Sequence, residues 1–128
     1  HPEHAWKVVR EAETAGPGLF LKTHPKSENV WTDATFAKDG NSNQTICVFK
    51  KKDFDADPTC FSATEHGKIV HFEYNKAGDE VWASVWDRKG ALIVYDDKTL
   101  KEKARIEADW MVTPTGKWNV YNTVHDVY

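Results

Sequence analysis

The chain has 128 residues, the size of a single domain, of which 40% are hydrophobic and 29% are charged. This composition is typical of a globular protein and is too apolar for simple disorder. The net charge is -3 at pH 7, with the two signs mixed along the chain, so there is no basic stripe to follow a phosphate backbone and a nucleic-acid partner is excluded. No apolar run approaches the roughly 18 residues of a membrane-spanning helix.

The N-terminal segment gives weak signals. The chain starts at His1 without a signal sequence, which indicates processing, truncation or trimming. The stretch His1–Thr14 is the one plausible helix, although its Trp and Val residues fit a β-strand equally well. Ala15–Gly18 then breaks the chain, and Leu19–Thr23 predicts a strand. Six Trp, four Tyr and six Phe give the whole chain a β-leaning composition.

A pattern then repeats along the chain. Each copy has a polar turn, a Val-Trp strand, a polar loop and a second apolar strand. The copies comprise residues 24–36 with 44–55, residues 73–86 with 91–100, and a partial third copy at 114–123. A period of roughly 40–50 residues with several short strands per unit is typical of propeller blades.

The predicted fold is therefore all-β, with two to three blades made of four-stranded antiparallel sheets. A closed propeller typically needs about four to eight blades. Two or three blades leave open sheet edges and uncovered blade faces. The chain is therefore expected to be part of a larger ring, or to associate with other copies of itself.

The two cysteines, Cys47 and Cys60, are too few for a disulfide framework. A single disulfide bond between them is one alternative that the sequence leaves open. Their apolar neighbours favour the other alternative, two buried free thiols. The two cysteines are also too far apart in sequence for a Cys-x-x-Cys-His haem c site.

Four segments resemble the C-terminal part of cytochrome cd1 nitrite reductase. They are FLKTHPKSENVW (20–31), HFEYNKAGDEVWASVW (71–86), VYDDKTLKEKA (94–104) and TPTGKWNVYNTVHDVY (113–128). The resemblance covers nearly the whole chain. Its most specific part is the last sixteen residues, and its weakest part is Asp39–Gly67.

This resemblance implies that residues 1–128 are the C-terminal segment of an eight-bladed propeller that holds haem d1. The segment would form one wall of the haem pocket and close the ring. The family is periplasmic, usually homodimeric, and reduces nitrite to nitric oxide in denitrification. It receives electrons from a cytochrome or cupredoxin donor. The remaining blades, or another copy of the chain, are the expected partners of this segment.

Four residues match family positions near haem d1: His71, Phe20, Gly116 and Thr115. His71 precedes the EYNK turn, where many family members carry Gln; both side chains donate hydrogen bonds, but only His titrates near neutral pH. Phe20 matches the aromatic residue at the haem face. Gly116 allows close approach of the backbone to the macrocycle, and Thr115 is its neighbour.

The family's proximal and distal haem d1 histidines lie upstream of the matched region. No catalytic residue is therefore assigned, and the chain alone is not expected to turn over. Two alternatives stay open beside nitrite reductase. One is a related propeller that carries or modifies haem d1 during its biosynthesis, and the other is a cofactor-free β-rich interaction module.

Further polar residues have simpler interpretations. His24 is predicted to be a turn residue rather than a ligand, and His1 with His4 is a weak metal signal because no third ligand is present. The pair His125 and Asp126 has no nucleophile beside it and fits a closing strand. Lys50–Asp53 is predicted to be a solvated hairpin face, and Glu65–Gly67 a loop between blades.

Overall fold

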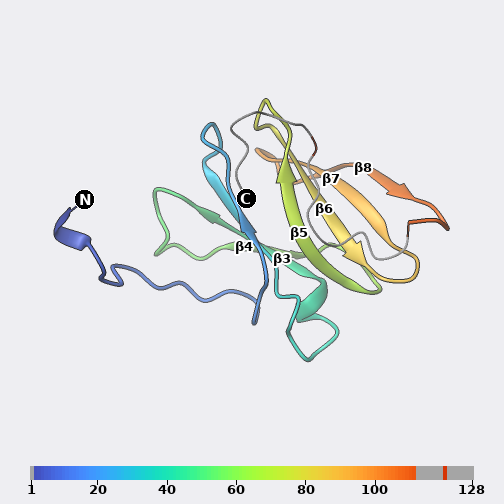
Figure 1. Cartoon of the computed structure of the whole chain (residues 1–128), viewed down its shortest axis with the longest axis horizontal. Coiled ribbons are helices and arrows are strands. Elements are labelled where there is room, and N and C mark those ends of the chain that lie inside the picture. Colours follow the sequence, from blue (N-terminus) through green and yellow to red (C-terminus); the bar gives the residue numbers. More distant parts are fainter. Residues whose placement is uncertain (1, 112–119, 121–128) are drawn as a thin grey trace.

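The computed structural model describes residues 2–111 and 120, and it consists of two four-stranded antiparallel sheets (Figure 1). The first sheet contains β1 (Leu21–Lys22), β2 (Asn29–Thr32), β3 (Thr45–Lys50) and β4 (Thr59–Ser62). The second contains β5 (Lys68–Tyr74), β6 (Glu80–Trp86), β7 (Ala91–Asp96) and β8 (Glu102–Glu107). Two short 3-10 turns, η1 (Pro2–His4) and η2 (Ser42–Gln44), complete the described elements.

Each sheet is a meander in which every strand pairs with the next along the chain, in the orders β1-β2-β3-β4 and β5-β6-β7-β8. This is the topology of a propeller blade. The prediction of four-stranded antiparallel blades is confirmed, and the described residues hold two of them. Glu65–Gly67 lies between β4 and β5, so its assignment to a loop between blades is also confirmed.

The sequence repeat is reproduced in the strand register. In the first sheet Val30 pairs with Phe49 and Trp31 with Val48. The second sheet has the corresponding pairs, Val81 with Tyr95 and Trp82 with Val94. Corresponding residues of the two copies therefore occupy equivalent positions in the two blades.

The main hydrophobic core lies between the two sheets. The fully buried Trp31 projects from the first sheet and contacts Phe72 and Tyr95 of the second, with ring centroids 6.3 and 5.5 Å apart. On β6 the alternate residues Val81, Ala83 and Val85 face this core. Because side chains alternate across a strand, Trp82 lies on the opposite face of its sheet. Each blade therefore directs the Trp of its second strand away from the preceding blade.

The other face of the first sheet carries a second, smaller cluster. Val30, Cys47 and Phe49 are buried there beneath the partly buried Ala15 and Phe54. Phe54 belongs to the loop after β3 and stacks on Phe49 at 5.9 Å. The first sheet therefore buries apolar residues on both faces, as expected of a sheet packed between two layers.

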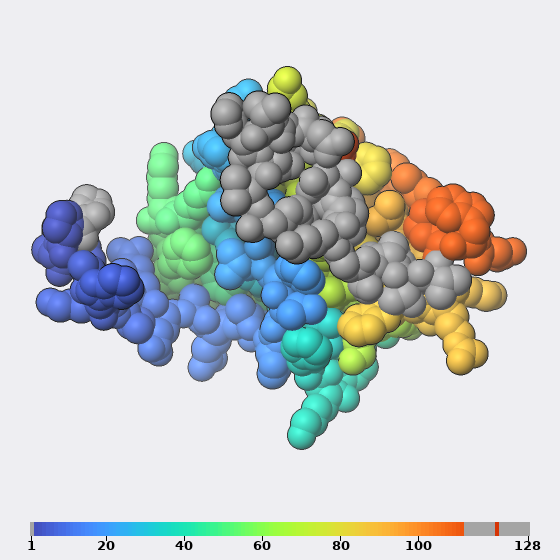
Figure 2. Space-filling view, in the orientation of Figure 1, coloured from blue at the N-terminus to red at the C-terminus, as the bar shows by residue number. Residues whose placement is uncertain are grey.

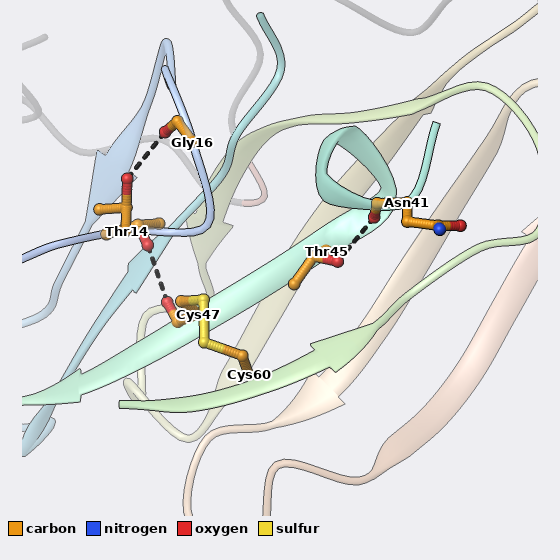
Figure 3. Close-up of a disulfide and its surroundings, with 7 residues drawn as sticks. Thr14, Gly16, Asn41, Thr45, Cys47 and Cys60 are labelled. Carbon is orange, nitrogen blue, oxygen red and sulfur yellow. Dashed lines mark hydrogen bonds between the residues drawn. A yellow bond between two sulfur atoms is a disulfide. The ribbon is translucent and has the colours of Figure 1, made fainter. Parts of the chain in front are cut away.

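The expectation of free thiols was wrong, because Cys47 and Cys60 form a disulfide between β3 and β4 (Figure 3). The two residues are direct cross-strand partners with a Cα–Cα distance of 4.1 Å. Cys47 is buried, as its apolar neighbours in the sequence suggested, whereas Cys60 is exposed. Strand pairing brought the two residues together, and the sequence spacing gave no sign of that pairing.

The prediction for His1–Thr14 was wrong in its described part, because residues 2–14 form neither a long helix nor a strand. Beyond η1, residues 5–14 have no regular structure and are exposed, and Figures 1 and 2 show the dark-blue start of this segment projecting from the body. Trp6, Val8 and Val9 bury little of their surface in the described structure. Short helices and lone strands need a buried apolar face to be stable, and residues 5–14 are all exposed.

A buried polar network joins the two sheets behind the Trp31 core. Asp97 follows β7, and its carboxylate accepts hydrogen bonds from Ser27 Oγ (2.6 Å), Trp31 Nε1 (2.8 Å) and Tyr74 Oη (2.7 Å). Its backbone carbonyl also accepts a bond from the Asn29 amide. Burial and the Asp97 carboxylate together raise the pKa of the Tyr74 phenol, which therefore stays protonated and donates.

Candidate functional site

The first strands of the two blades, β1 and β5, contact each other. Phe20 immediately precedes β1, and His71 lies in the middle of β5. Their rings stack with centroids 4.6 Å apart and planes inclined by 14°. The structure therefore brings together two of the four residues that the sequence singled out. His71 is buried, with 1% of its surface exposed, whereas Phe20 is only partly buried.

The backbone at His71 is unusual. Its φ is +67°, and the register of β5 against β6 shifts between Val70 and Phe72. A non-glycine residue with positive φ is uncommon, although His is among the types that adopt it more often. Bulges redirect a side chain and are frequent beside functional sites. The bulge therefore sets the direction of the imidazole.

The buried carboxylate of Asp33 ties this bulge to the first blade. Asp33 Oδ2 accepts a bond from the His71 backbone N–H at 3.3 Å. The same carboxylate accepts bonds from the backbone N–H groups of Leu19 (2.7 Å) and Phe20 (3.2 Å). One side chain thus fixes the backbone of both stacked residues, which come from different blades.

A second carboxylate contacts the His71 ring. Glu73 Oε1 lies 3.0 Å from His71 Nε2, and both side chains are buried. Lys22 Nζ, on β1, lies 3.3 Å from each of the two Glu73 carboxylate oxygens. The site therefore contains an aromatic ring, an imidazole, two carboxylates and an ammonium group at the junction of the two blades.

Sequence reasoning missed Asp33, Glu73 and Lys22. Only Glu73 had a usable signal, since residues two apart on a strand share a face and Glu73 follows His71 by two. Asp33 acts through backbone groups of residues distant in sequence, and no local pattern reveals such contacts. The other two predicted site residues, Gly116 and Thr115, lie outside the described residues.

The remaining histidines have separate surroundings. His24 is a turn residue, as predicted: its Nδ1 accepts a bond from the Lys26 backbone, while its carbonyl accepts bonds from Ser27 N–H and Lys51 Nζ. Partial burial and the neighbouring lysines lower the pKa of His24. His66 lies 2.6 Å from Asp87, and this hydrogen bond lowers the pKa of the Asp87 carboxyl.

Metal binding has no support among residues 2–111 and 120, where no three His, Cys, Asp or Glu side chains gather around a common point. His1 of the proposed His1–His4 pair, and both His125 and Asp126, lie outside the described residues. Within the same described part of the chain, no helix has the length and apolar character to cross a membrane.

The donor set at the blade junction suits a flat aromatic macrocycle with carboxylate substituents. The partly exposed Phe20 ring offers a surface for stacking. His71 carries N–H groups that can recognise a carboxylate. Haem d1 is a ligand of this kind, so the residues present fit the group that the family resemblance implied.

The fold defines the chain as two adjacent blades of a β-propeller. A model of the family described as "Cytochrome D1 heme domain" matches residues 1–123. The chain belongs to this family.

Two curated relatives and one solved structure support this assignment. The nitrite reductase of Stutzerimonas stutzeri is 43% identical over 141 aligned positions that cover 100% of this chain. The dihydro-heme d1 dehydrogenase of Pseudomonas aeruginosa is 37% identical over 120 positions, or 93% of the chain. The solved structure titled dihydro-heme d1 dehydrogenase NirN in complex with DHE matches with a TM-score of 0.77 and 33% identity over 89% of the chain.

The chain spans only about a quarter of these relatives. It covers 25% of the nitrite reductase, 23% of the dehydrogenase and 23% of the solved chain. The expectation of a haem d1 propeller segment is therefore confirmed at the level of family and fold. The activities named for the complete relatives are therefore statements about those proteins.

Proposed function

We propose that this chain is the C-terminal segment of the haem d1 propeller of a nitrite reductase, where it forms one wall of the cofactor pocket and closes the ring. The observation that carries the proposal is the stacked pair Phe20 and His71 at the blade junction of a cytochrome d1 haem domain. When bound, haem d1 supplies the redox chemistry that converts nitrite to nitric oxide. The blades supply binding, orientation and electrostatics.

The burial of the two site residues suggests different roles for them. Phe20 is the more accessible of the pair and would lie against the macrocycle face. His71 lies behind it and, when both ring nitrogens carry a proton, would donate to a haem carboxylate at the ring edge. In the proposal, Gly116 and Thr115 complete the same wall, where the glycine permits close backbone approach.

The proposed partners of the segment are the other blades of the propeller. The face of the first sheet that points away from the second blade carries a groove of about 420 Å³. Leu21, Val30, Phe49 and Phe54 line it, and residues 10–14 run along it. An apolar sheet face of this kind is suited to a preceding blade. Homodimerisation and a cytochrome or cupredoxin donor belong to the proposal for the complete protein.

The disulfide supports a periplasmic location. Disulfides form and persist in oxidising compartments, and the bacterial periplasm is one of them. Cys60 is exposed on β4 and would be open to reducing systems in the cytoplasm. The bridge is therefore consistent with a protein that works outside the cytoplasm.

The test is reconstitution of the complete propeller from the upstream blades and this segment, followed by titration with haem d1. We expect a haem spectrum, and weaker retention of haem in Phe20→Ala and His71→Ala. Phe36→Ala is the control, because Phe36 is an exposed aromatic of the first blade at 53% exposure. Haem retention that is unchanged without this segment, or unchanged in both site variants, contradicts the proposal.

A second candidate is a propeller of haem d1 biosynthesis. The dihydro-heme d1 dehydrogenase is 37% identical to the chain over 93% of its length. The two candidates are separated by activity of the reconstituted protein. Nitric oxide production from nitrite supports the first candidate, whereas oxidation of the dihydro form of haem d1 without nitrite turnover supports the second.

A further inference from the structure

The contact between His71 and Glu73 determines which ring nitrogen carries a proton. An ionised carboxylate only accepts hydrogen bonds. Glu73 Oε1 lies 3.0 Å from His71 Nε2, so Nε2 must be the donor. In the neutral ring Nδ1 is then an acceptor, and it donates only when the ring carries a second proton. The carboxylate therefore fixes both the orientation of the imidazole and its neutral tautomer.

Lys22 is the reason that a buried carboxylate can occupy this place. Burying an unpaired carboxylate is costly, and a close ammonium group offsets that cost. Lys22 Nζ lies 3.3 Å from both Glu73 oxygens, and its side chain is 30% exposed while that of Glu73 is 5% exposed. Lys22 comes from β1 and Glu73 from β5, so the ion pair crosses between the two blades.

Asp33 has a different task at the same site. Its carboxylate accepts bonds from backbone N–H groups of Leu19, Phe20 and His71. It therefore holds the main chain of the bulge, whereas Glu73 contacts the imidazole itself. The orientation of the ring within that fixed backbone depends on Glu73.

We propose that Glu73 is a positioning residue for His71 and that Lys22 holds Glu73 in this role. Glu73 keeps the proton on Nε2 and holds the ring plane parallel to Phe20. This inference rests on the proposed function, because the positioned imidazole is the group that would meet a carboxylate of haem d1. It adds to that function two residues, one from each blade, which act through His71 rather than by touching the cofactor.

The direct test measures the tautomer of His71 by ¹⁵N NMR of the histidine-labelled chain without cofactor. His71→Gln identifies the resonances. In the wild type we expect the neutral ring to carry its proton on Nε2 alone. Glu73→Leu removes the acceptor and should make the Nδ1–H form detectable. Glu73→Gln keeps a carbonyl oxygen at the same place and should restore the wild-type tautomer.

The second measurement is haem d1 affinity of the complete propeller. At metal sites, loss of a group that orients a ligating side chain typically costs about tenfold or more in metal affinity, and an effect of the same order is expected for the orientation of His71. We therefore expect the Kd for haem d1 to rise about tenfold in Glu73→Leu and to recover in Glu73→Gln. Glu80→Gln is the matched control, because Glu80 pairs with Lys103 on the exposed side of the same blade, 2.5 Å apart.

Three results would overturn the inference. The first is a wild-type His71 that carries its proton on Nδ1, a measurement that needs no variant to fold. The second is an unchanged tautomer in a folded Glu73→Leu chain. The third is an equal loss of haem affinity in Glu80→Gln. If no form of the protein binds haem d1, the proposed function fails, and the NMR measurement alone decides the role of Glu73.

Discussion

Several individual residues adopt conformations that only their surroundings make favourable. His71 has a φ of +67°, which for a non-glycine residue typically costs about 1–3 kcal/mol and persists only when neighbouring contacts impose it. The bond from its backbone N–H to Asp33 and the stacking on Phe20 are such contacts. An outlier of this kind beside buried charged groups is what motivates a functional role for His71.

Gly78, in the turn between β5 and β6, has the same backbone requirement and in addition lacks room for a side chain. Its φ is +79°, and a Cβ there would collide with the imidazole of His24. We predict that Gly78→Ala lowers the free energy of unfolding by about 1–3 kcal/mol, measured by urea denaturation.

Gly40→Ala is the matched control, because nothing lies within 4 Å of its added Cβ and its φ is not positive. It should change stability by less than about 1 kcal/mol. Adding His24→Ala to Gly78→Ala should recover part of the loss by removing the collision. Equal effects of the two glycine substitutions would show that the Gly78 turn is not strained.

At the scale of elements, the two sheets are held together by a polar contact as well as by the apolar core. Ser27 and Trp31 of the first blade, and Tyr74 of the second, all donate to the Asp97 carboxylate. Asp97 lies in the turn after β7 and is 6% exposed. The hydrogen bonds orient the Trp31 indole, so the polar network also determines how the core packs.

Asp97→Ala is predicted to be strongly destabilising. It leaves buried donors of Ser27, Trp31 and Tyr74 without their acceptor, and we expect a loss of roughly 3–5 kcal/mol in the free energy of unfolding. Tryptophan fluorescence during urea denaturation measures it, and Trp31 fluorescence should shift toward that of a more hydrated indole.

The adjacent Asp96→Ala is the comparison. Asp96 accepts bonds from the backbone of Lys98 and Thr99 in an exposed turn. Loss of these two hydrogen bonds, which cap the turn, should lower the free energy of unfolding by about 1 kcal/mol. A loss in Asp97→Ala no larger than that in Asp96→Ala would mean that the network does not hold the blades together.

For the whole molecule, the two tyrosines buried between the blades make the free energy of unfolding fall at alkaline pH. Burial raises the pKa of both Tyr74 and Tyr95 above the ordinary value of 10.0, helped by the carboxylates of Asp97 and Glu102 respectively. In the folded chain both phenols therefore stay neutral at pH values where the unfolded chain ionises them. The stabilisation is fully present below pH 10 and is lost as pH rises above it.

We predict that the free energy of unfolding falls above pH 10 by up to about 1.4 kcal/mol per pH unit for each of the two tyrosines. Tyr74→Phe should remove the contribution of Tyr74 to this fall. The free energy of unfolding should then decrease less steeply between pH 10 and 12. Denaturation series at fixed ionic strength for wild type and variant give the comparison. The same slope in both proteins would mean that Tyr74 ionises in the folded state as it does in the unfolded state.

Much of the fold and part of the site follow from the sequence alone. The repeat of Val-Trp and apolar strands predicted the blades, because strand pairing places corresponding residues in corresponding register, as Val30 with Phe49 and Val81 with Tyr95 show. Family motifs selected Phe20 and His71. These features are local in sequence, since alternation and turn chemistry act over a few residues.

Only the tertiary structure decided the contacts between distant residues. The pairing of β3 with β4 placed Cys47 opposite Cys60 and turned two expected thiols into a disulfide. The approach of β1 to β5 brought Lys22 to Glu73 and placed Asp33 between Phe20 and His71. Residues 5–14 are irregular because they bury no apolar face. Such contacts depend on how strands and blades pack, and strand periodicity carries no information about which distant side chains will meet.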